Sequence, residues 1–288
     1  MRTGSGFLLV TVAGALALLA ACQSAPLRQP QDQAQPKPAA PATRSTAAER
    51  RLAEAKPRLM SADYRADLAD LARLRDQVAP LADDPAIGYL AHYWAGFASW
   101  RLAMNGANHA MSVGDIKAHL ESAAADFEAC IRLRDDFADG YAAAASVNGW
   151  LTGITRDDKA VMSAHLALAN RRLARAKELA PANPRVLWVE GGALYFAPAA
   201  YGGSQERGME AWRRAAEPGA AAPAASALAP DWGQPEALMS LAFGHLNQAA
   251  PDLASAGNEA HAALRLVPEW SYVRDVLLPQ IEARQKQR

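Results

Sequence analysis

The sequence predicts an all-α fold, an α-solenoid of helical hairpins, and three observations support this prediction. About a quarter of the 288 residues are alanine, the strongest helix former, whereas aromatic residues make up only 7%. Apolar residues recur at helical spacing from residue 47 onward, as in the stripe Leu68, Leu71, Leu74, Val78 and Leu81. Helix breakers such as Asn105-Gly106 and Asn183-Pro184 separate the stripes. No alternating run of β-branched residues with a hairpin turn competes with this interpretation.

The charge balance bears on the class of partner. The chain has 30 basic and 30 acidic residues, which gives a formal net charge of zero. A protein that binds nucleic acid through electrostatics usually shows a basic excess or a basic face. The composition therefore argues against a nucleic-acid partner.

Residues 1–21 have the layout of a signal peptide. A basic start at Arg2 precedes an apolar run from Phe7 to Ala21. This run is shorter than the about 20 residues that a membrane-spanning helix needs. A basic start, a short apolar middle and small residues at its end are typical of a secretory signal.

The signal ends in Leu19-Ala20-Ala21-Cys22, which resembles the lipobox of bacterial lipoproteins. The resemblance implies cleavage before Cys22, acylation of its thiol and of the new amino group, and stable anchoring by several acyl chains. Gln23 stands where an Asp tends to retain such lipoproteins in the inner membrane. We therefore expect a lipid-anchored protein of the cell envelope, at the outer membrane and facing the periplasm. The alternative is a soluble periplasmic protein in which Cys22 is incidental.

Residues 22–46 are expected to form a disordered tether. They are rich in Pro, Gln and Ala and carry almost no large apolar side chain. Such a segment buries too little surface to offset the entropy of folding. The tether would hold the following domain, residues 47–288, away from the membrane.

A recurring pattern predicts that the helices of residues 47–288 pack in pairs. One helix reads Ala169, Leu173, Ala176 and is followed by Pro181, and the helix after it carries Trp188, Gly192 and Tyr195. The same small–large–small spacing recurs, with substitutions, at Ala123/Phe127/Cys130, Gly208/Trp212/Ala215 and Ala256/Ala260/Ala263. Small residues allow close approach of two helices, and the large side chain of one helix fills the space beside them.

This spacing resembles the tetratricopeptide repeat (TPR), over roughly residues 84–268 in four divergent pairs. A helix near 61–80 would cap one end, and residues 269–285 would cover the other. The stretches 183–185, 198–203, 231–233 and 276–279 are similar to uncharacterised exported TPR proteins of bacteria. An Ala/Pro-rich loop from Pro218 to Pro230 departs from the pattern because it inserts between paired helices.

No catalytic, metal-binding or cofactor-binding constellation is evident in the sequence. None of the six histidines forms an i, i+4 pair, and no phosphate-binding loop is present. Acidic pairs such as Asp83-Asp84 and Asp157-Asp158 fall at predicted helix boundaries, where they favour helix capping. Cys130 stands at a packing position and is expected to be a small buried residue. We therefore expect no enzyme, no metal and no cofactor.

One region is a candidate groove for a partner or ligand. It contains Trp188, Tyr195, Phe196, Tyr201, Gly202 and Gly203. The aromatic side chains could line a groove, and the alternative is that they form the core of the repeat. Backbone N–H groups at Gly202-Gly203, ahead of a helix capped by Ser204, could hold an anion. The alternative there is a turn that needs positive φ.

Two functions remain open at the level of sequence. The first is a non-catalytic envelope lipoprotein whose TPR-like domain binds protein or peptide partners as a scaffold or assembly factor, because stacked helical hairpins form an extended concave surface. The alternative is a small-molecule-binding TPR-like lipoprotein associated with a periplasmic transport system, with its ligand near residues 188–204.

Overall fold

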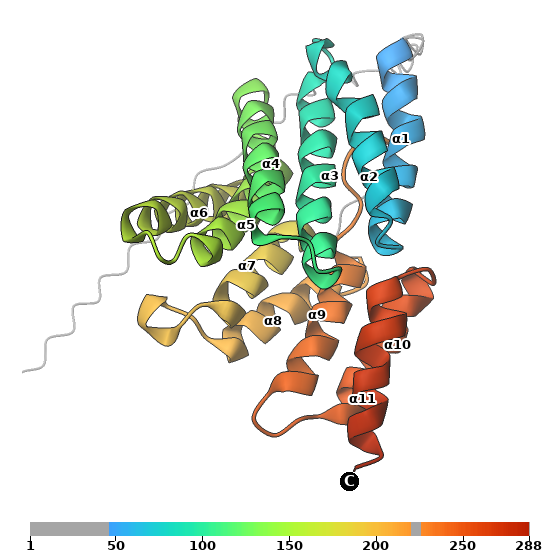
Figure 1. Cartoon of the computed structure of the whole chain (residues 1–288), viewed down its shortest axis with the longest axis vertical. Coiled ribbons are helices and arrows are strands. Elements are labelled where there is room, and N and C mark those ends of the chain that lie inside the picture. Colours follow the sequence, from blue (N-terminus) through green and yellow to red (C-terminus); the bar gives the residue numbers. More distant parts are fainter. Residues whose placement is uncertain (1–45, 220–225, 288) are drawn as a thin grey trace, which may run out of the picture. The chain divides into compact units, whose positions relative to one another are not determined.

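A computed structural model describes residues 46–219 and 226–287, and within these residues the chain is helical, without a strand. The all-α prediction is confirmed (Figure 1). The expected signal peptide, Cys22, the tether as far as residue 45 and residues 220–225 of the Ala/Pro-rich loop lie outside the described residues.

The described helices follow one another in consecutive pairs, which supports a helical-repeat architecture (Figure 1). The pairs are α1 (Ala47–Tyr64) with α2 (Leu68–Val78), α3 (Gly88–Asn108) with α4 (Val113–Leu133), α5 (Ala138–Ile154) with α6 (Lys159–Leu179), α7 (Pro184–Phe196) with α8 (Gln205–Ala216), and α9 (Gln234–Asn247) with α10 (Leu253–Leu266). A π-helical turn, Tyr272–Leu277, then leads into α11 (Leu278–Gln285). Short 3₁₀ turns lie at Ala79–Asp83 and Ala199–Tyr201.

Side-chain caps fix where the helices begin. Thr46 accepts a hydrogen bond from the Glu49 amide and Glu49 reaches back to the Thr46 amide, so a capping box starts α1 at the predicted residue. Asp158 caps α6 and Asn183 caps α7 just before Pro184. Asp84 accepts a hydrogen bond from the Ala86 amide just before α3. An acidic residue thus lies at this helix boundary, as the sequence predicted.

In α4, α8 and α10 the small–large–small residues of the second helix are buried, whereas in α6 the large residue, Leu173, is half-buried. In α4, Ala123, Phe127 and Cys130 are fully buried, and in α10 so are Ala256, Ala260 and Ala263. Phe127 packs against Gly96 of α3, where a Cβ would come within 3.0 Å of its ring. Burial raises the pKa of the Cys130 thiol far above its ordinary range, which fits a packing role.

The corresponding close contact in the α7–α8 pair uses Gly191, and the prediction of Gly192 was wrong. A Cβ on Gly191 would overlap the Trp212 indole, whereas a Cβ on Gly192 would meet open space. Consecutive residues of an α-helix point about 100° apart, so a shift of one position turns the glycine away from the partner helix.

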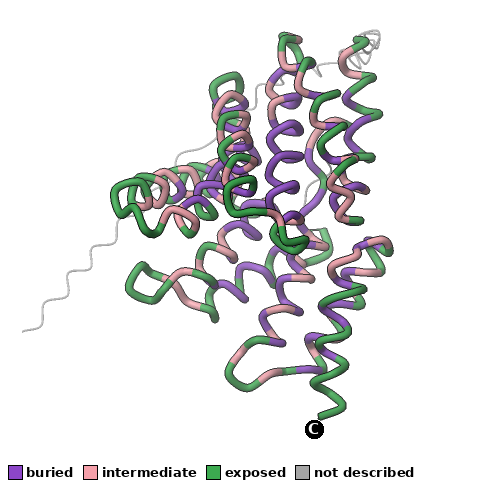
Figure 2. Tube along the Cα trace, viewed as in Figure 1, coloured by how far each residue is buried: buried purple, intermediate pink, exposed green. Residues whose placement is uncertain are grey.

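Burial is concentrated on the first helix of each pair (Figure 2). Helix α3 is the most deeply buried element, because Tyr93, Trp94, Phe97 and Trp100 have no exposed surface. Helix α6, by contrast, buries fully only Ala169 and Ala176. The aromatic side chains of α3 form the centre of the core.

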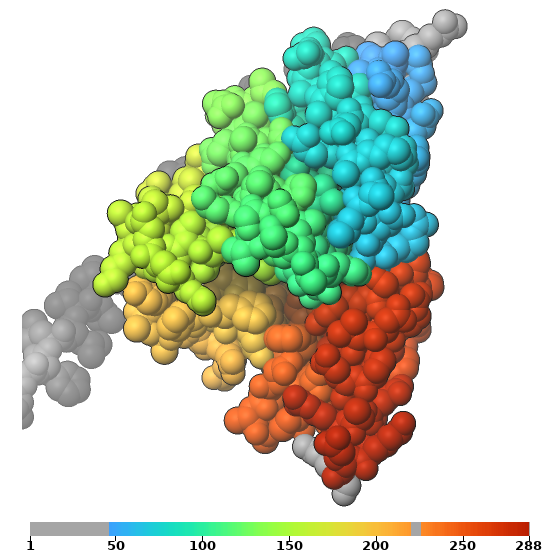
Figure 3. All heavy atoms as spheres, in the orientation of Figure 1, coloured from blue at the N-terminus to red at the C-terminus, as the bar shows by residue number. Residues whose placement is uncertain are grey.

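The first and last parts of this helical domain touch. The rings of Tyr64, at the end of α1, and Trp270, just after α10, have centroids 5.0 Å apart. The Ser271 hydroxyl donates to the Tyr64 carbonyl oxygen, across a sequence separation of 207 residues. In Figure 3 the surface of the C-terminal helices meets that of the N-terminal helices directly. The two ends of the described helical domain are therefore in contact.

Candidate functional site

Residues 226–233, which we call the strap, lie across the inner side of α1 and α3. The Lys56 ammonium donates to the Ala227 carbonyl oxygen at 3.1 Å and to the Asp231 carboxylate at 2.8 Å. The Trp94 indole N–H donates to the Leu228 carbonyl oxygen at 2.8 Å. Figure 1 shows the strap as the orange segment beside α3. The described end of the Ala/Pro-rich loop thus joins two hairpins and packs against α1 and α3.

Trp232 of the strap enters an aromatic cluster at the centre of the domain. Its ring centroid lies 5.6 Å from that of Trp188, 5.8 Å from that of Trp100 and 6.0 Å from that of Phe97. The Trp232 indole N–H donates to the Tyr93 hydroxyl oxygen at 3.0 Å. Aromatic side chains of this size dominate the energetics of a core, so this cluster fixes the strap in place.

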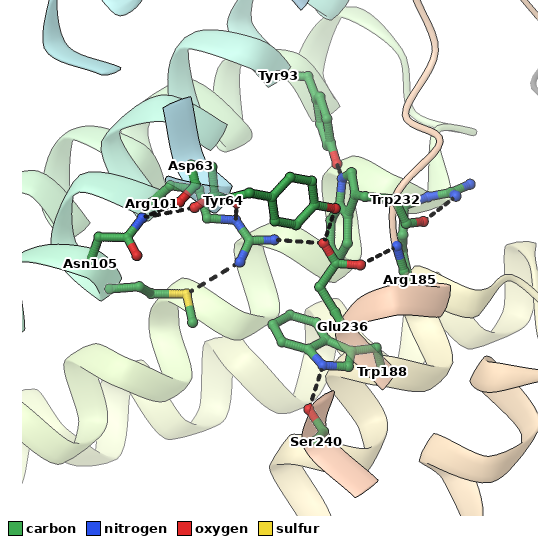
Figure 4. A network of polar contacts seen from close by, with 12 residues as sticks. Asp63, Tyr64, Tyr93, Arg101, Asn105, Arg185, Trp188, Trp232, Glu236 and Ser240 are labelled. Atoms are coloured by element: carbon green, nitrogen blue, oxygen red, sulfur yellow. Dashed lines mark hydrogen bonds and ion pairs between the residues drawn. The ribbon is translucent and has the colours of Figure 1, made fainter. Parts of the chain in front are cut away.

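The guanidinium of Arg101 lies within the same cluster (Figure 4). Its central carbon is 4.6 Å from the ring centroid of Trp100, 4.7 Å from that of Phe97 and 5.1 Å from that of Trp232. Only 5% of Arg101 is exposed. Cation–π attraction is strongest for such a desolvated cation, and it offsets part of the cost of burying the charge.

Two buried carboxylates balance the charge of Arg101. Its Nε atom is 3.4 Å from Asp63 Oδ2, and its Nη2 atom is 4.0 Å from Glu236 Oε1. Glu236 also accepts from the Tyr64 hydroxyl at 2.7 Å and from the Gly233 amide at 2.6 Å. Burial raises the pKa of Asp63 to about 6, although Arg101 opposes the shift. This network joins α1, α3 and the start of α9.

A second buried ion pair holds the other end of the strap. Arg185 of α7 pairs with Asp139 of α5 at 2.6 Å and also donates to the Trp232 carbonyl oxygen at 2.9 Å. The side-chain amide of Asn183 donates to the same Asp139 carboxylate. Arg185 and Asp139 are thus bonded to one another and Arg185 to the strap, an arrangement that positions α5, α7 and the strap.

An open groove lies beside the strap, between α1 and the end of α10, and we call it the α1–α10 groove. Its volume is about 590 Å³. It is lined by Ala53, Pro57 and Met60 of α1, by Asp231 and Trp232 of the strap, and by Leu266 and Glu269 at and after the end of α10. Half of the Leu266 surface is exposed. A concave, partly apolar surface with a few charged groups is the usual form of a binding site.

The residues of the sequence-predicted groove do not come together in one place. Trp188 is 9% exposed and belongs to the central aromatic cluster, where its indole N–H donates to the Ser240 hydroxyl at 2.9 Å. Tyr195 is buried against Trp212, with ring centroids 4.9 Å apart, and Phe196 packs on Tyr195. Phe196 and Tyr201 are themselves 67% and 65% exposed. The structure thus brings Tyr195 and Phe196 together and places Trp188 elsewhere.

The Gly202-Gly203 segment forms a turn with positive φ, which was the alternative to an anion-binding site. Gly202 has a φ of 84°, a left-handed conformation that favours glycine. The amides of Gly202, Gly203 and Ser204 donate to the carbonyl oxygens of Ala199, Pro198 and Leu194. These three N–H groups are therefore used within the turn and are not presented to an anion.

The groove residues were not identified from the sequence. Pro57, inside an otherwise regular helix, was the one local signal, because proline removes a helical hydrogen bond. For Asp231 and Trp232 the sequence indicates only that they belong to the stretch 231–233, which is similar to exported TPR proteins. Nothing in the local sequence marks Met60, Leu266 or Glu269 as neighbours.

Two other kinds of site are absent from the described residues. No group of three or more His, Cys, Asp or Glu side chains gathers there as a metal centre would require. None of the helices in residues 46–219 and 226–287 combines the length and apolar character needed to cross a membrane. In comparisons with known proteins, no family model and no curated protein matches the chain.

Proposed function

We propose that the chain is an envelope lipoprotein whose TPR-like domain holds a protein or peptide partner in the α1–α10 groove, in a scaffold or assembly role without catalysis. The observation that carries this proposal is the groove itself. It leaves Leu266 and the apolar face of α1 uncovered, while the aromatic side chains of the neighbouring core are packed.

The TPR-like character of the domain rests on its packing. Helices α4, α8 and α10 bury the small–large–small residues, and Phe127 and Trp212 fill the space beside Gly96 and Gly191. Close approach at a small residue, filled by a large one, is the packing that the repeat pattern requires. Stacked hairpins of this kind commonly serve as binding surfaces.

The anchor is proposed from the Leu19-Ala20-Ala21-Cys22 motif. Substitution of Cys22→Ala tests it in cells. Loss of the acylated thiol should leave an unprocessed precursor or release the protein into the soluble periplasmic fraction. Unchanged processing and unchanged membrane fractionation would contradict the anchor.

A small-molecule partner is the second candidate, and the size of the groove favours it. A volume of about 590 Å³ falls within the about 300–1,000 Å³ that small-molecule sites occupy. Trp188, which was expected to line the ligand site, is instead packed in the core. A thermal-shift screen with hydrophobic metabolites separates the candidates, because a ligand that binds only the folded chain raises its melting temperature.

Affinity purification from crosslinked envelopes tests the proposed function. The full chain should recover a specific protein, and Leu266→Asp, which places a charge in the apolar part of the groove, should lose it. Leu133→Asp is the matched control, since Leu133 is 59% exposed at the end of α4 and does not line the groove. Failure to recover a specific protein, or equal recovery by both variants, would overturn the proposal.

A further inference from the structure

We infer that the occupant of the α1–α10 groove is an extended segment of a partner protein in which an apolar side chain and a Lys or Arg lie two residues apart. The inference rests on the proposed function and specifies the chemistry of the partner. It follows from the apolar lining, the charge and the length of the groove.

The apolar part of the groove has two walls. One is the face of α1 formed by Ala53, Pro57 and Met60, which recur at helical spacing and therefore share one side of the helix. The other is Leu266, which keeps half of its surface exposed. Trp232 of the strap contributes to the lining as well. An apolar side chain placed between the two walls would remove all of these surfaces from water, which is favourable.

The charged groups of the groove favour a cation. Asp231 has 56% of its side chain exposed, and the half-buried Glu269 lies after α10. The one basic residue of the lining, Lys56, is only 8% exposed, and its ammonium already donates to Ala227 and Asp231 of the strap. The described lining thus carries two carboxylates against one ammonium. Because Lys56 is bonded to Asp231, Glu269 is the carboxylate left to pair with a Lys or Arg side chain of the occupant.

The length of the groove suits a short segment of extended chain. Its lining follows α1 from Ala53 to Tyr64, which is about 16 Å at the rise of an α-helix. This distance accommodates about four or five residues of extended chain. Side chains two residues apart point to the same side of an extended chain, so an apolar and a basic side chain at this spacing could contact the apolar walls and the carboxylates at the same time.

Fluorescence anisotropy with two labelled peptides tests the inference on the full-length chain in detergent. One peptide carries the sequence Leu-Ala-Arg-Ala-Lys between alanines, and its twin has Glu in both basic positions. We expect the basic peptide to bind at least tenfold more tightly. Glu269→Gln should weaken its binding about threefold, as for an exposed ion pair, and Leu266→Ser about tenfold. Leu133→Ser, at an equally exposed leucine outside the groove, should leave binding unchanged.

The outcomes separate this inference from the proposed function. Equal or tighter binding of the acidic peptide, no binding of either peptide, or binding that is insensitive to Glu269→Gln and Leu266→Ser would overturn the basic–apolar assignment. Competition by spermidine as strong as that by the unlabelled basic peptide would assign the groove to a small amine instead. In each case a partner that is captured from envelopes and lost in Leu266→Asp would still sustain the proposed function.

Discussion

The ring of Tyr64, at the end of the first helix, packs on the ring of Trp270, which follows the tenth, with centroids 5.0 Å apart. The Tyr64 hydroxyl also donates to Glu236, a carboxylate 4.0 Å from the Arg101 guanidinium. One residue thus connects the contact between the two ends of the domain with the charged network in its interior. The two ends should therefore not behave independently.

Trp270→Ala should destabilise both ends of the domain together. Trp270 is 8% exposed, and truncation of a buried tryptophan costs about 3–5 kcal/mol. Hydrogen exchange should accelerate in α1 as well as in α10 and α11, because Tyr64 loses its packing partner. Faster exchange limited to α10 and α11 would show that contact with α1 contributes nothing to stability.

Gly191→Ala should destabilise the domain by about 2 kcal/mol, whereas Gly192→Ala should stabilise it by about 0.5–1 kcal/mol. A methyl group at Gly191 overlaps the buried Trp212 indole and forces the two helices apart. The same group at Gly192 meets open space and gains the higher helix propensity of alanine. Urea unfolding of the two variants measures the difference. Equal effects would contradict the packing of Gly191, rather than Gly192, against α8.

Lys56→Met should loosen the strap without unfolding the domain. Lys56 provides hydrogen bonds to Ala227 and Asp231, and methionine keeps the apolar stem while removing both. The freed carboxylate of Asp231 is already 56% exposed, so it can be solvated. We expect faster proteolysis within residues 226–231 and a loss of about 1 kcal/mol in stability. Arg58→Met, on the exposed side of α1, is the control. Identical cleavage of the two variants would exclude a holding role for Lys56.

Glu259→Gln should change how stability depends on pH. Burial raises the pKa of Glu259 from its ordinary 4.5 to about 7. The folded chain thus holds the proton of the Glu259 carboxyl more tightly than the unfolded chain does. The contribution of this proton to the free energy of unfolding is therefore full below pH 4.5 and is lost as the pH rises to about 7. Glutamine stays neutral, so the difference in unfolding free energy, variant minus wild type, should rise between these values and then level off.

The charged groups around Glu259 also affect its pKa. His245 faces it at 3.5 Å, and its pKa is lowered by burial, so it offers little positive charge to stabilise the carboxylate. Arg213 opposes the upward shift of the Glu259 pKa and Asp252 adds to it. Glu282→Gln, the same substitution at an exposed position of α11, is the matched control. Parallel stability curves for wild type and Glu259→Gln would contradict the buried carboxyl.

The hairpins could be predicted from sequence because they depend on local periodicity. The pattern of Ala123, Phe127 and Cys130 repeats within one helix, and its burial follows from helical geometry alone. The choice between Gly191 and Gly192 required the rotation of one helix against its partner, which is set by the side chains of both. The pattern therefore predicted the correct pair of helices and the wrong contact residue.

The strap, the buried cation and the groove could not be predicted, since each joins distant parts of the chain. Trp94 contacts Leu228 across 134 residues, and Lys56 contacts Asp231 across 175. Arg101 lies in a helix whose sequence is mostly apolar. The aromatic rings around its guanidinium come from three separate segments, α3, α7 and the strap. In the sequence Leu266 is an ordinary residue at the end of a helix, and only the structure shows that it lines the groove together with α1. Local propensity and spacing contain none of these long-range pairings.

Site-specific photocrosslinking at Met60 tests the central claim most directly. Met60 is half-buried in the wall of the α1–α10 groove. A benzophenone amino acid at this position in cells should form one defined adduct with an envelope protein, and a basic segment of that protein should be the site of attachment. The same group at Leu133 should form none. Adducts of equal yield at both positions, or no adduct at Met60, would contradict the assignment of the groove as the binding site.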